Sequence, residues 1–317
     1  MIPLVSICVP IYNVENYIER CAISLLEQSY GEIEYVFVND CSPDQSIEVL
    51  RRVLEKYPER KSFVKIISHE KNLGLAAARN TAINHSEGDF IFHVDSDDYL
   101  GIDAVEKLVN KQRETDADIV TGQAVQMEKD KSSVMRRPQF LSQDDFVKEM
   151  IVPSISHTIW GRLIRKSLYT DNGIEAKEGV NIGEDLQAMS KLAYYAKKVE
   201  TIWDVVYYYD CTNELSYMNQ FDTASIRRLV QDTTSMEIVR DFFVGKSDRF
   251  QNQAEVYLRD YYLKLLRYYG RSKKKEDFER IQKRLFGLHP QNRKMPKQQE
   301  MKFGSYRMFR LVDSILK

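Results

Sequence analysis

The sequence predicts an α/β fold with a mostly parallel central sheet, followed by a helical C-terminal region. Through the first 125 residues, short apolar runs alternate with amphipathic segments, which is the pattern of parallel strands joined by helices. Polar and acidic residues follow several of these runs, at the strand ends where such sheets bind ligands. From about residue 221 onward, the apolar residues keep a helical spacing.

The predicted elements follow one another along the chain. Strands rich in β-branched and aromatic residues are expected at 5–11, 35–38, 63–67, 90–94 and 118–121. Helices with apolar residues at helical spacing are expected at 14–28, 46–57, 73–85 and 102–113. Residues 126–140 are polar and are expected to form an exposed connection. Mixed elements follow, including one at 160–168, and then a helix at 184–196 and a strand with a tyrosine run at 199–209.

Length and composition describe a globular protein of about two domains. The 317 residues are 43% hydrophobic and 29% charged, which allows packed cores and argues against extensive disorder. We expect a first domain over residues 1–217 and a helical region with a basic tail over 218–317. The net charge of -1 gives no general attraction to nucleic acid.

The sequence also predicts a cytoplasmic protein. Its four cysteines form neither a CxxC pair nor a zinc-binding pattern, which indicates a reducing compartment. The chain enters its first strand without the basic segment and apolar run of a signal peptide. No segment approaches the roughly 18 uninterrupted apolar residues of a membrane span.

The strongest chemical signal is the run Asp95-Ser96-Asp97-Asp98, which directly follows the strand expected at 90–94. Carboxylates at a strand end can converge on one hard cation, and Mg²⁺ and Mn²⁺ are often held by one or two carboxylates together with substrate phosphates. Ser96 or Asp98 could instead cap the following helix. A cap accounts for one acidic residue and not for three, so we expect a divalent metal here.

Three weaker signals each have a structural alternative. Asp40 follows the second strand, where it could accept a hydrogen bond from a base or ribose, or simply begin a turn. Arg79 could neutralise a diphosphate or be an ordinary surface residue. Glu184 and Asp185 could supply a general base for a hydroxyl nucleophile, or only a favourable acidic first turn of a helix.

Together these motifs resemble the family 2 inverting glycosyltransferases, which have the GT-A fold. The resemblance covers about residues 4–217, and its motifs are specific in order and spacing. The motifs lie at 5–13, 38–44, 72–80 and 95–98, with weaker echoes at 160–163, 184–185 and 207–209. The resemblance implies a GT-A domain whose nucleotide-sugar half is about 1–125 and whose acceptor half is about 126–217.

The resemblance also implies a role for each matching residue. Asp97, together with Asp95, would hold Mn²⁺ or Mg²⁺. Asp185, beside Glu184, would be the base that deprotonates the acceptor. The residues implied in nucleotide binding, with Asp40 reading uracil or its counterpart, are Pro10, Tyr12, Asn13, Asp40, Arg79, Asp95 and Ser96.

The implied function is the transfer of a hexose from a nucleoside-diphosphate sugar, with UDP as the favoured nucleotide, to a hydroxyl of a glycan or lipid-linked glycan. A single displacement would invert the anomeric carbon, and surface polysaccharide biosynthesis is the expected setting. A noncatalytic nucleotide-sugar-binding module and a nucleotidyltransferase remain as alternatives. A nucleotidyltransferase usually carries a Gly-rich phosphate loop, whereas Tyr12-Asn13-Val14-Glu15 follows the first strand here. The absence of a GxGxxG motif after that strand argues against an NAD-binding protein.

Two positions depart from the family pattern. Cys41 stands where Gly is usual, which is tolerable if the backbone there is not left-handed. Asp210 stands where Arg commonly follows the tyrosine run. That Arg would neutralise the charge of the leaving diphosphate, so the sequence leaves this role open, and a Lys or Arg elsewhere in the chain could take it.

The C-terminal tail is basic and amphipathic. From residue 259 to 317 there are 17 Lys or Arg against 6 Asp or Glu, a net charge of +11. Such a helix could lie at an anionic membrane surface, or it could pack on its own domain. The apolar positions at helical spacing are Phe303, Tyr306, Phe309, Val312, Ile315 and Leu316, and the cations around them are Lys302, Arg307, Arg310 and Lys317.

Overall fold

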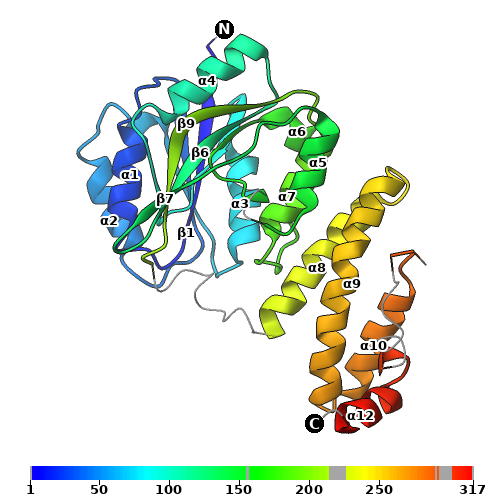
Figure 1. Ribbon diagram of the computed structural model, residues 1–317. Coiled ribbons are helices and arrows are strands. Elements are labelled where there is room, and N and C mark those ends of the chain that lie inside the picture. Colours follow the sequence, from blue (N-terminus) through cyan, green and yellow to red (C-terminus); the bar gives the residue numbers. More distant parts are fainter. Residues whose placement is uncertain (1, 155–156, 214–225, 290, 293–301, 316–317) are drawn as a thin grey trace. The chain divides into compact units, whose positions relative to one another are not determined.

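The computed structural model describes residues 2–154, 157–213, 226–289, 291–292 and 302–315 (Figure 1). The chain divides into two compact units, Met1–Gln220 and Phe221–Lys317. The domain boundary predicted between residues 217 and 218 lies outside the described residues.

The first half of the sheet is parallel, as predicted. Its strands lie in the order β3-β2-β1-β4 and are all paired in parallel. Every residue of β1 is buried, which explains why this strand has apolar residues on both faces. The bounds are β1 (Val5–Ile11), β2 (Ile33–Asn39), β3 (Val64–Ser68) and β4 (Phe90–His93).

The second half makes the sheet mixed rather than mostly parallel. There β6 and β9 pair in parallel, whereas β8 pairs with β4 and β6 in antiparallel fashion and β5 pairs with β9 in the same way. The exposed connection predicted at 126–140 is partly wrong, because β6 runs on to residue 127 and pairs with β7 in a hairpin. The bounds are β5 (Tyr99–Leu100), β6 (Ile119–Met127), β7 (Ser132–Met135), β8 (Arg162–Arg165) and β9 (Val199–Asp210).

Helices cover both faces of this sheet (Figure 1). In the figure α1 and α2 lie on one side, and α3, α6 and α7 lie on the other. The Ala-rich α3 packs closely on β1 and β2, because its small side chains permit a close approach. The bounds are α1 (Ile18–Leu26), α2 (Ser46–Leu54), η1 (Lys61–Phe63), α3 (Leu75–His85), α4 (Ala104–Thr115), α5 (Gln143–Ile151), α6 (Lys166–Thr170) and α7 (Glu184–Tyr195).

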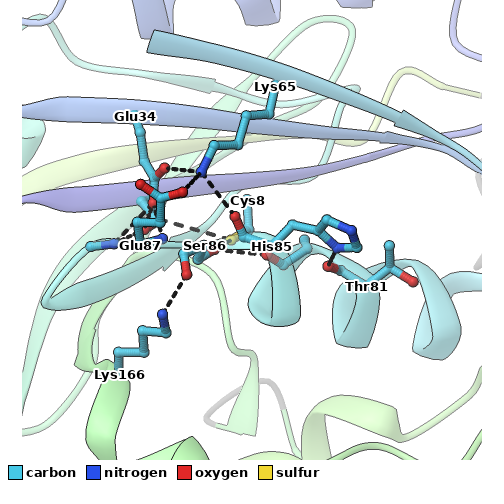
Figure 2. A network of polar contacts seen from close by, with 11 residues as sticks. Cys8, Glu34, Lys65, Thr81, His85, Ser86, Glu87 and Lys166 are labelled. Atoms are coloured by element: carbon cyan, nitrogen blue, oxygen red, sulfur yellow. Dashed lines mark hydrogen bonds and ion pairs between the residues drawn. The ribbon is translucent and has the colours of Figure 1, made fainter.

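A network of polar contacts connects the strands at the end of the sheet where β1 begins (Figure 2). The Glu34 carboxylate accepts hydrogen bonds from Ser6 Oγ (2.5 Å), Gly88 N (2.9 Å), Lys65 Nζ (3.0 Å) and Glu87 N. Burial alone would raise the pKa of Glu34, but these donors lower it below its ordinary value. The network therefore joins three strands to the turn before β4. A side chain at Gly88 would lie 2.5 Å from Ser6 Oγ, so that turn needs glycine.

The second unit is helical, as predicted. Its helices are α8 (Ile226–Phe243), α9 (Asp248–Arg271), α10 (Lys275–Phe286) and α12 (Tyr306–Ile315). Phe309 is fully buried and packs against Phe278 and Phe303, with ring centroids 5.4 and 5.7 Å apart. Gly270 of α9 leaves room for the Phe309 ring, which a Cβ there would meet at 2.2 Å. In the part of the chain that is described, no helix is long and apolar enough to cross a membrane.

Candidate active site

The predicted site residues Pro10, Tyr12 and Asn13 lie at the carboxyl end of β1. Pro10 is buried within β1 and pairs with Val38 of β2. Tyr12 is 47% exposed, so its ring is available to stack on a ligand. Asn13 has a positive φ of 57°, and its main-chain N–H donates to Ser42 Oγ at 2.8 Å.

Cys41 adopts a left-handed backbone conformation, with φ of 56°. Cys at this position was expected to be tolerable if the backbone was not left-handed, and this condition is not met. A non-glycine residue in this region costs roughly 1 kcal/mol or more, because its Cβ crowds the following carbonyl oxygen. The thiol is exposed, so no packing contact offsets that strain.

The buried carboxylate of Asp40 holds the loop that leads into α3. It accepts hydrogen bonds from His69 Nδ1 at 2.7 Å and from the main-chain nitrogens of Leu73 and Gly74, both at 2.8 Å. A carboxylate has about four acceptor positions, so one further bond to a ligand is still possible. Asp40 thus has a structural role at the carboxyl end of β2, the place where a base-reading residue was predicted.

Arg79 is the centre of the site. Its guanidinium is almost fully buried and donates to Asp95 Oδ1 at 2.7 Å, to Glu184 Oε1 at 2.6 Å and to Asp185 Oδ1. Burial would lower the pKa of Arg79, but Asp185, Asp95 and Glu184 raise it well above its ordinary value. The surface alternative is therefore wrong. One arginine joins α3, the end of β4 and the start of α7.

The acidic run after β4 divides by function. Asp97 accepts a hydrogen bond from Asn213 Nδ2 at 2.9 Å, while Asp95 keeps its side chain partly exposed beside Arg79. Asp98 is fully buried and accepts from Tyr207 Oη at 2.6 Å. Asp98 is therefore a structural acid, whereas Asp95 and Asp97 remain as candidate metal ligands.

The helix-capping alternative is wrong for both residues to which it was applied. The helix that follows, α4, begins at Ala104, and the residue before it is Asp103. Ser96 is buried within the acidic run and belongs to the turn before β5.

The chemistry of this donor set fits a hard divalent cation. Burial and the repulsion of Asp95 raise the pKa of Asp97 to about 6, so a cation nearby would relieve an unfavourable negative charge. Within the described ranges, no group of three or more His, Cys, Asp or Glu side chains could hold a metal by itself. Mg²⁺ and Mn²⁺ are commonly bound by two carboxylates, with substrate phosphates and water as the further ligands.

Asp185 and Glu184 lie in the first turn of α7 and point to Arg79. The second oxygen of Asp185 accepts from Ile159 N at 3.1 Å. Burial raises the pKa of Asp185, and Arg79 offsets part of this effect. Burial and the charge of Asp185 also raise the pKa of Glu184. A carboxylate with a raised pKa is a stronger base than an exposed one, as a general base requires. Their position also agrees with the alternative that these two acids only form a favourable acidic first turn of the helix.

Two residues of the site were missed from the sequence. Tyr207 accepts a hydrogen bond from Asp95 N at 3.1 Å and donates to Asp98, and its ring stacks on Trp160 with centroids 4.4 Å apart. The tyrosine run was noted, and the alternation of β9 could have indicated which tyrosine faces inward. Asn213 carried no signal, since only the fold brings it to Asp97.

Known proteins with similar sequences are glycosyltransferases. A model of Glycosyl transferase family 2 matches residues 6–173. The uncharacterized glycosyltransferase EpsJ of Bacillus subtilis is 32% identical over 217 residues, which cover 66% of this chain and 61% of EpsJ. The chain thus spans less than two thirds of that relative.

Two solved structures have the same fold. S. aureus TarS 1-349 in complex with UDP-GlcNAc gives a TM-score of 0.61 at 20% identity, covering 88% of this chain and 90% of that chain. The mannosyltransferase PcManGT from Pyrobaculum calidifontis, in complex with GDP-Man and Mn²⁺, gives 0.57 at 17% identity, covering 99% and 85%. The GT-A fold expected from the motifs is confirmed.

Proposed function

The chain belongs to glycosyl transferase family 2, and we propose that it is an inverting, metal-dependent hexosyltransferase. Its donor would be a UDP-sugar, and its acceptor a hydroxyl of a glycan or lipid-linked glycan in polysaccharide biosynthesis. The observation that carries this proposal is the joining of Asp95, Glu184 and Asp185 around Arg79, beside Asp97. One edge of the sheet then offers both metal-binding carboxylates and a base.

The donor would be bound by the residues at the carboxyl ends of β1, β2 and β4. Tyr12 is exposed beside the buried Pro10 and would contact the nucleotide with its ring. The remaining acceptor capacity of Asp40 suits an N–H of the base. Asn13 and Ser96 complete the group of residues assigned to nucleotide binding.

A divalent cation would be held by Asp97 and Asp95. Bound there, Mn²⁺ or Mg²⁺ would supply Lewis-acid stabilisation of the charge on the leaving diphosphate. Because Arg79 already has three carboxylate partners, we assign it to organising the site rather than to neutralising the leaving group.

Asp185 would take the proton of the acceptor hydroxyl as its oxygen attacks the anomeric carbon. Arg79 and Ile159 N hold the two carboxylate oxygens, which orients the base before the acceptor arrives. Glu184 is a second carboxylate of the same cluster. A single displacement by the acceptor oxygen breaks the bond to the diphosphate and inverts the anomeric carbon.

The similar proteins support the choice of donor and metal. TarS has been solved with UDP-GlcNAc, and PcManGT with GDP-Man and Mn²⁺. A Poly(ribitol-phosphate) beta-glucosyltransferase of Bacillus spizizenii is 31% identical over 208 residues. These names favour transfer of a sugar over transfer of a nucleotidyl group, and so favour a glycosyltransferase over the nucleotidyltransferase and the noncatalytic module.

We also propose a cytoplasmic location with peripheral contact at an anionic membrane surface. The support is the +11 charge of residues 259–317. Phe303 and Phe309 are buried inside the C-terminal unit, so the packing alternative holds for them and the contact would depend on cations. Cosedimentation of the full-length chain with anionic vesicles tests this, and equal recovery with neutral vesicles would contradict it.

The experiment that tests the proposed function is a screen of nucleotide sugars for manganese-dependent hydrolysis. We expect at least one UDP-sugar to be hydrolysed with Mn²⁺ and not with EDTA. Product analysis should then give inversion at the anomeric carbon. Binding of the nucleotide sugar without any turnover, with or without glycan acceptors, would instead support a noncatalytic module.

A further inference from the structure

An ion pair between α1 and the end of β9 meets the acidic run 95–98 and has no part in the proposed chemistry. Arg20 Nη2 lies 2.5 Å from Asp210 Oδ2. The same nitrogen donates to the main-chain oxygen of Asp97 at 2.9 Å. One guanidinium nitrogen therefore joins α1 and β9 to the residue proposed as the main metal ligand.

The partners of Arg20 are themselves fixed. Its guanidinium lies over the ring of Tyr99 at 4.4 Å, and that ring stacks on Tyr208 with centroids 4.7 Å apart. The main-chain nitrogen of Asp210 donates to Asp98 Oδ1 at 2.8 Å. The side chain of Asp210 is 5% exposed, whereas that of Arg20 is 45% exposed. The acid is the buried, rigid partner, and the arginine reaches it from the surface.

The end of β9 and the residues that follow it are bonded to the acidic run at two points. Asp210 bonds Asp98 through its main chain, and Asn213 donates to the Asp97 carboxylate at 2.9 Å. Arg20, which is paired with Asp210, adds a third hydrogen bond, to the main-chain oxygen of Asp97. A carboxylate whose main chain and side chain are both held loses less freedom when a cation binds, which favours binding.

We propose that Arg20 and Asp210 are positioning residues that hold Asp97 for divalent-metal binding. This inference rests on the proposed function, because it takes Asp97 as a metal ligand. It explains an acid at position 210: Asp210 anchors the arginine of α1. The pair acts through the Asp97 main chain, so it should affect metal affinity before it affects nucleotide affinity.

Titration of Mn²⁺ into the UDP-bound, full-length chain, followed by electron paramagnetic resonance, tests this. Arg20→Met keeps an apolar stem over Tyr99 but removes both hydrogen bonds. We expect its Mn²⁺ affinity to fall about tenfold, the lower end for residues that orient metal ligands, because Arg20 is half exposed. Affinity for UDP without metal should stay unchanged.

A matched control comes from the neighbouring residue on α1. Glu19 pairs with Lys56 at 3.4 Å on the surface and does not touch the acidic run. Glu19→Gln therefore removes an ion pair of the same helix and should leave Mn²⁺ affinity at the wild-type value. Equal losses in Glu19→Gln and Arg20→Met would overturn the proposal, since a general effect on α1 would then suffice.

A second variant keeps the test decisive if Arg20→Met folds poorly. Asp210→Asn keeps the main-chain bond to Asp98 and removes the ion pair, so it should weaken Mn²⁺ binding in the same direction. Combining it with Arg20→Met should cost less than the two separate losses multiplied, because the residues act as one unit. Wild-type Mn²⁺ affinity in both variants overturns the proposal. If wild type itself binds no Mn²⁺, the metal assignment fails, and this inference with it.

Discussion

Replacing Asp185 with asparagine separates the chemical role of the residue from its structural one. Asparagine has nearly the same shape, and its oxygen can still accept from Ile159 N, where the present bond is 3.1 Å. It cannot take a proton from the acceptor. General bases contribute about 10²- to 10⁴-fold, which corresponds to about 3 to 5 kcal/mol of barrier, so we expect transfer to slow by at least about 100-fold.

The stability of this variant should not fall in parallel. Burial, partly offset by Arg79, raises the pKa of Asp185 in the folded chain above its unfolded value. For an acid, this means that the ionised form opposes folding as pH rises above the unfolded pKa. The neutral asparagine removes that cost at neutral pH. The asparagine NH2 group would face the Arg79 guanidinium, which opposes this gain, while Arg79 keeps Asp95 and Glu184 as partners. We therefore expect Asp185→Asn to fold and to melt close to the wild-type temperature.

The assay is manganese-dependent hydrolysis of a UDP-sugar, together with calorimetric titration of the donor. Donor affinity should change little, because the base contacts the acceptor. Asp144→Asn is a matched control, since Asp144 is an exposed acid in the first turn of α5. If Asp185→Asn lost no more activity than this control, only a helix-dipole role would remain. If Glu184→Gln were inactive instead, the base would be Glu184.

Three further predictions concern the fold and the donor pocket. Cys41→Gly should stabilise the chain by about 0.5–1 kcal/mol in urea unfolding, because glycine relieves the left-handed strain but adds unfolded-state entropy, and an unchanged midpoint would contradict it. Glu34→Gln should destabilise the chain at neutral pH, because the pKa of Glu34 is lowered in the folded state. The difference in unfolding free energy from wild type should therefore shrink as the pH falls through that folded pKa. Asp40→Ala should weaken donor binding more than it slows turnover, and unchanged donor affinity would remove Asp40 from the pocket.

The parallel half of the sheet could be predicted because its strands are buried on both faces. The strand Val5–Ile11 is fully buried and apolar except for Ser6, and further polar residues begin where it ends. By contrast, Ser132–Met135 of β7 is mostly exposed and pairs with β6 off the main strand order, so no buried face marks it in the sequence. The two-residue β5 is too short to carry any period.

The residues proposed for the candidate site, apart from Tyr207 and Asn213, could be named from the sequence, but their contacts could not. Asp97 and Asp98 are neighbours with the same side chain, yet one remains a candidate ligand and the other bonds Tyr207, more than 100 positions away. The three carboxylate partners of Arg79 come from two separate segments. Local sequence carries no information on such pairs, because the packing of distant elements decides them.

The measurement that tests metal-dependent transfer most directly compares wild type with Asp97→Asn in UDP-sugar turnover across a series of Mn²⁺ concentrations. We predict that wild type saturates with Mn²⁺, whereas Asp97→Asn shows no Mn²⁺-dependent turnover while its melting temperature and circular dichroism remain those of a folded chain. Near-normal turnover of Asp97→Asn with the same Mn²⁺ dependence would contradict Asp97 as the metal ligand.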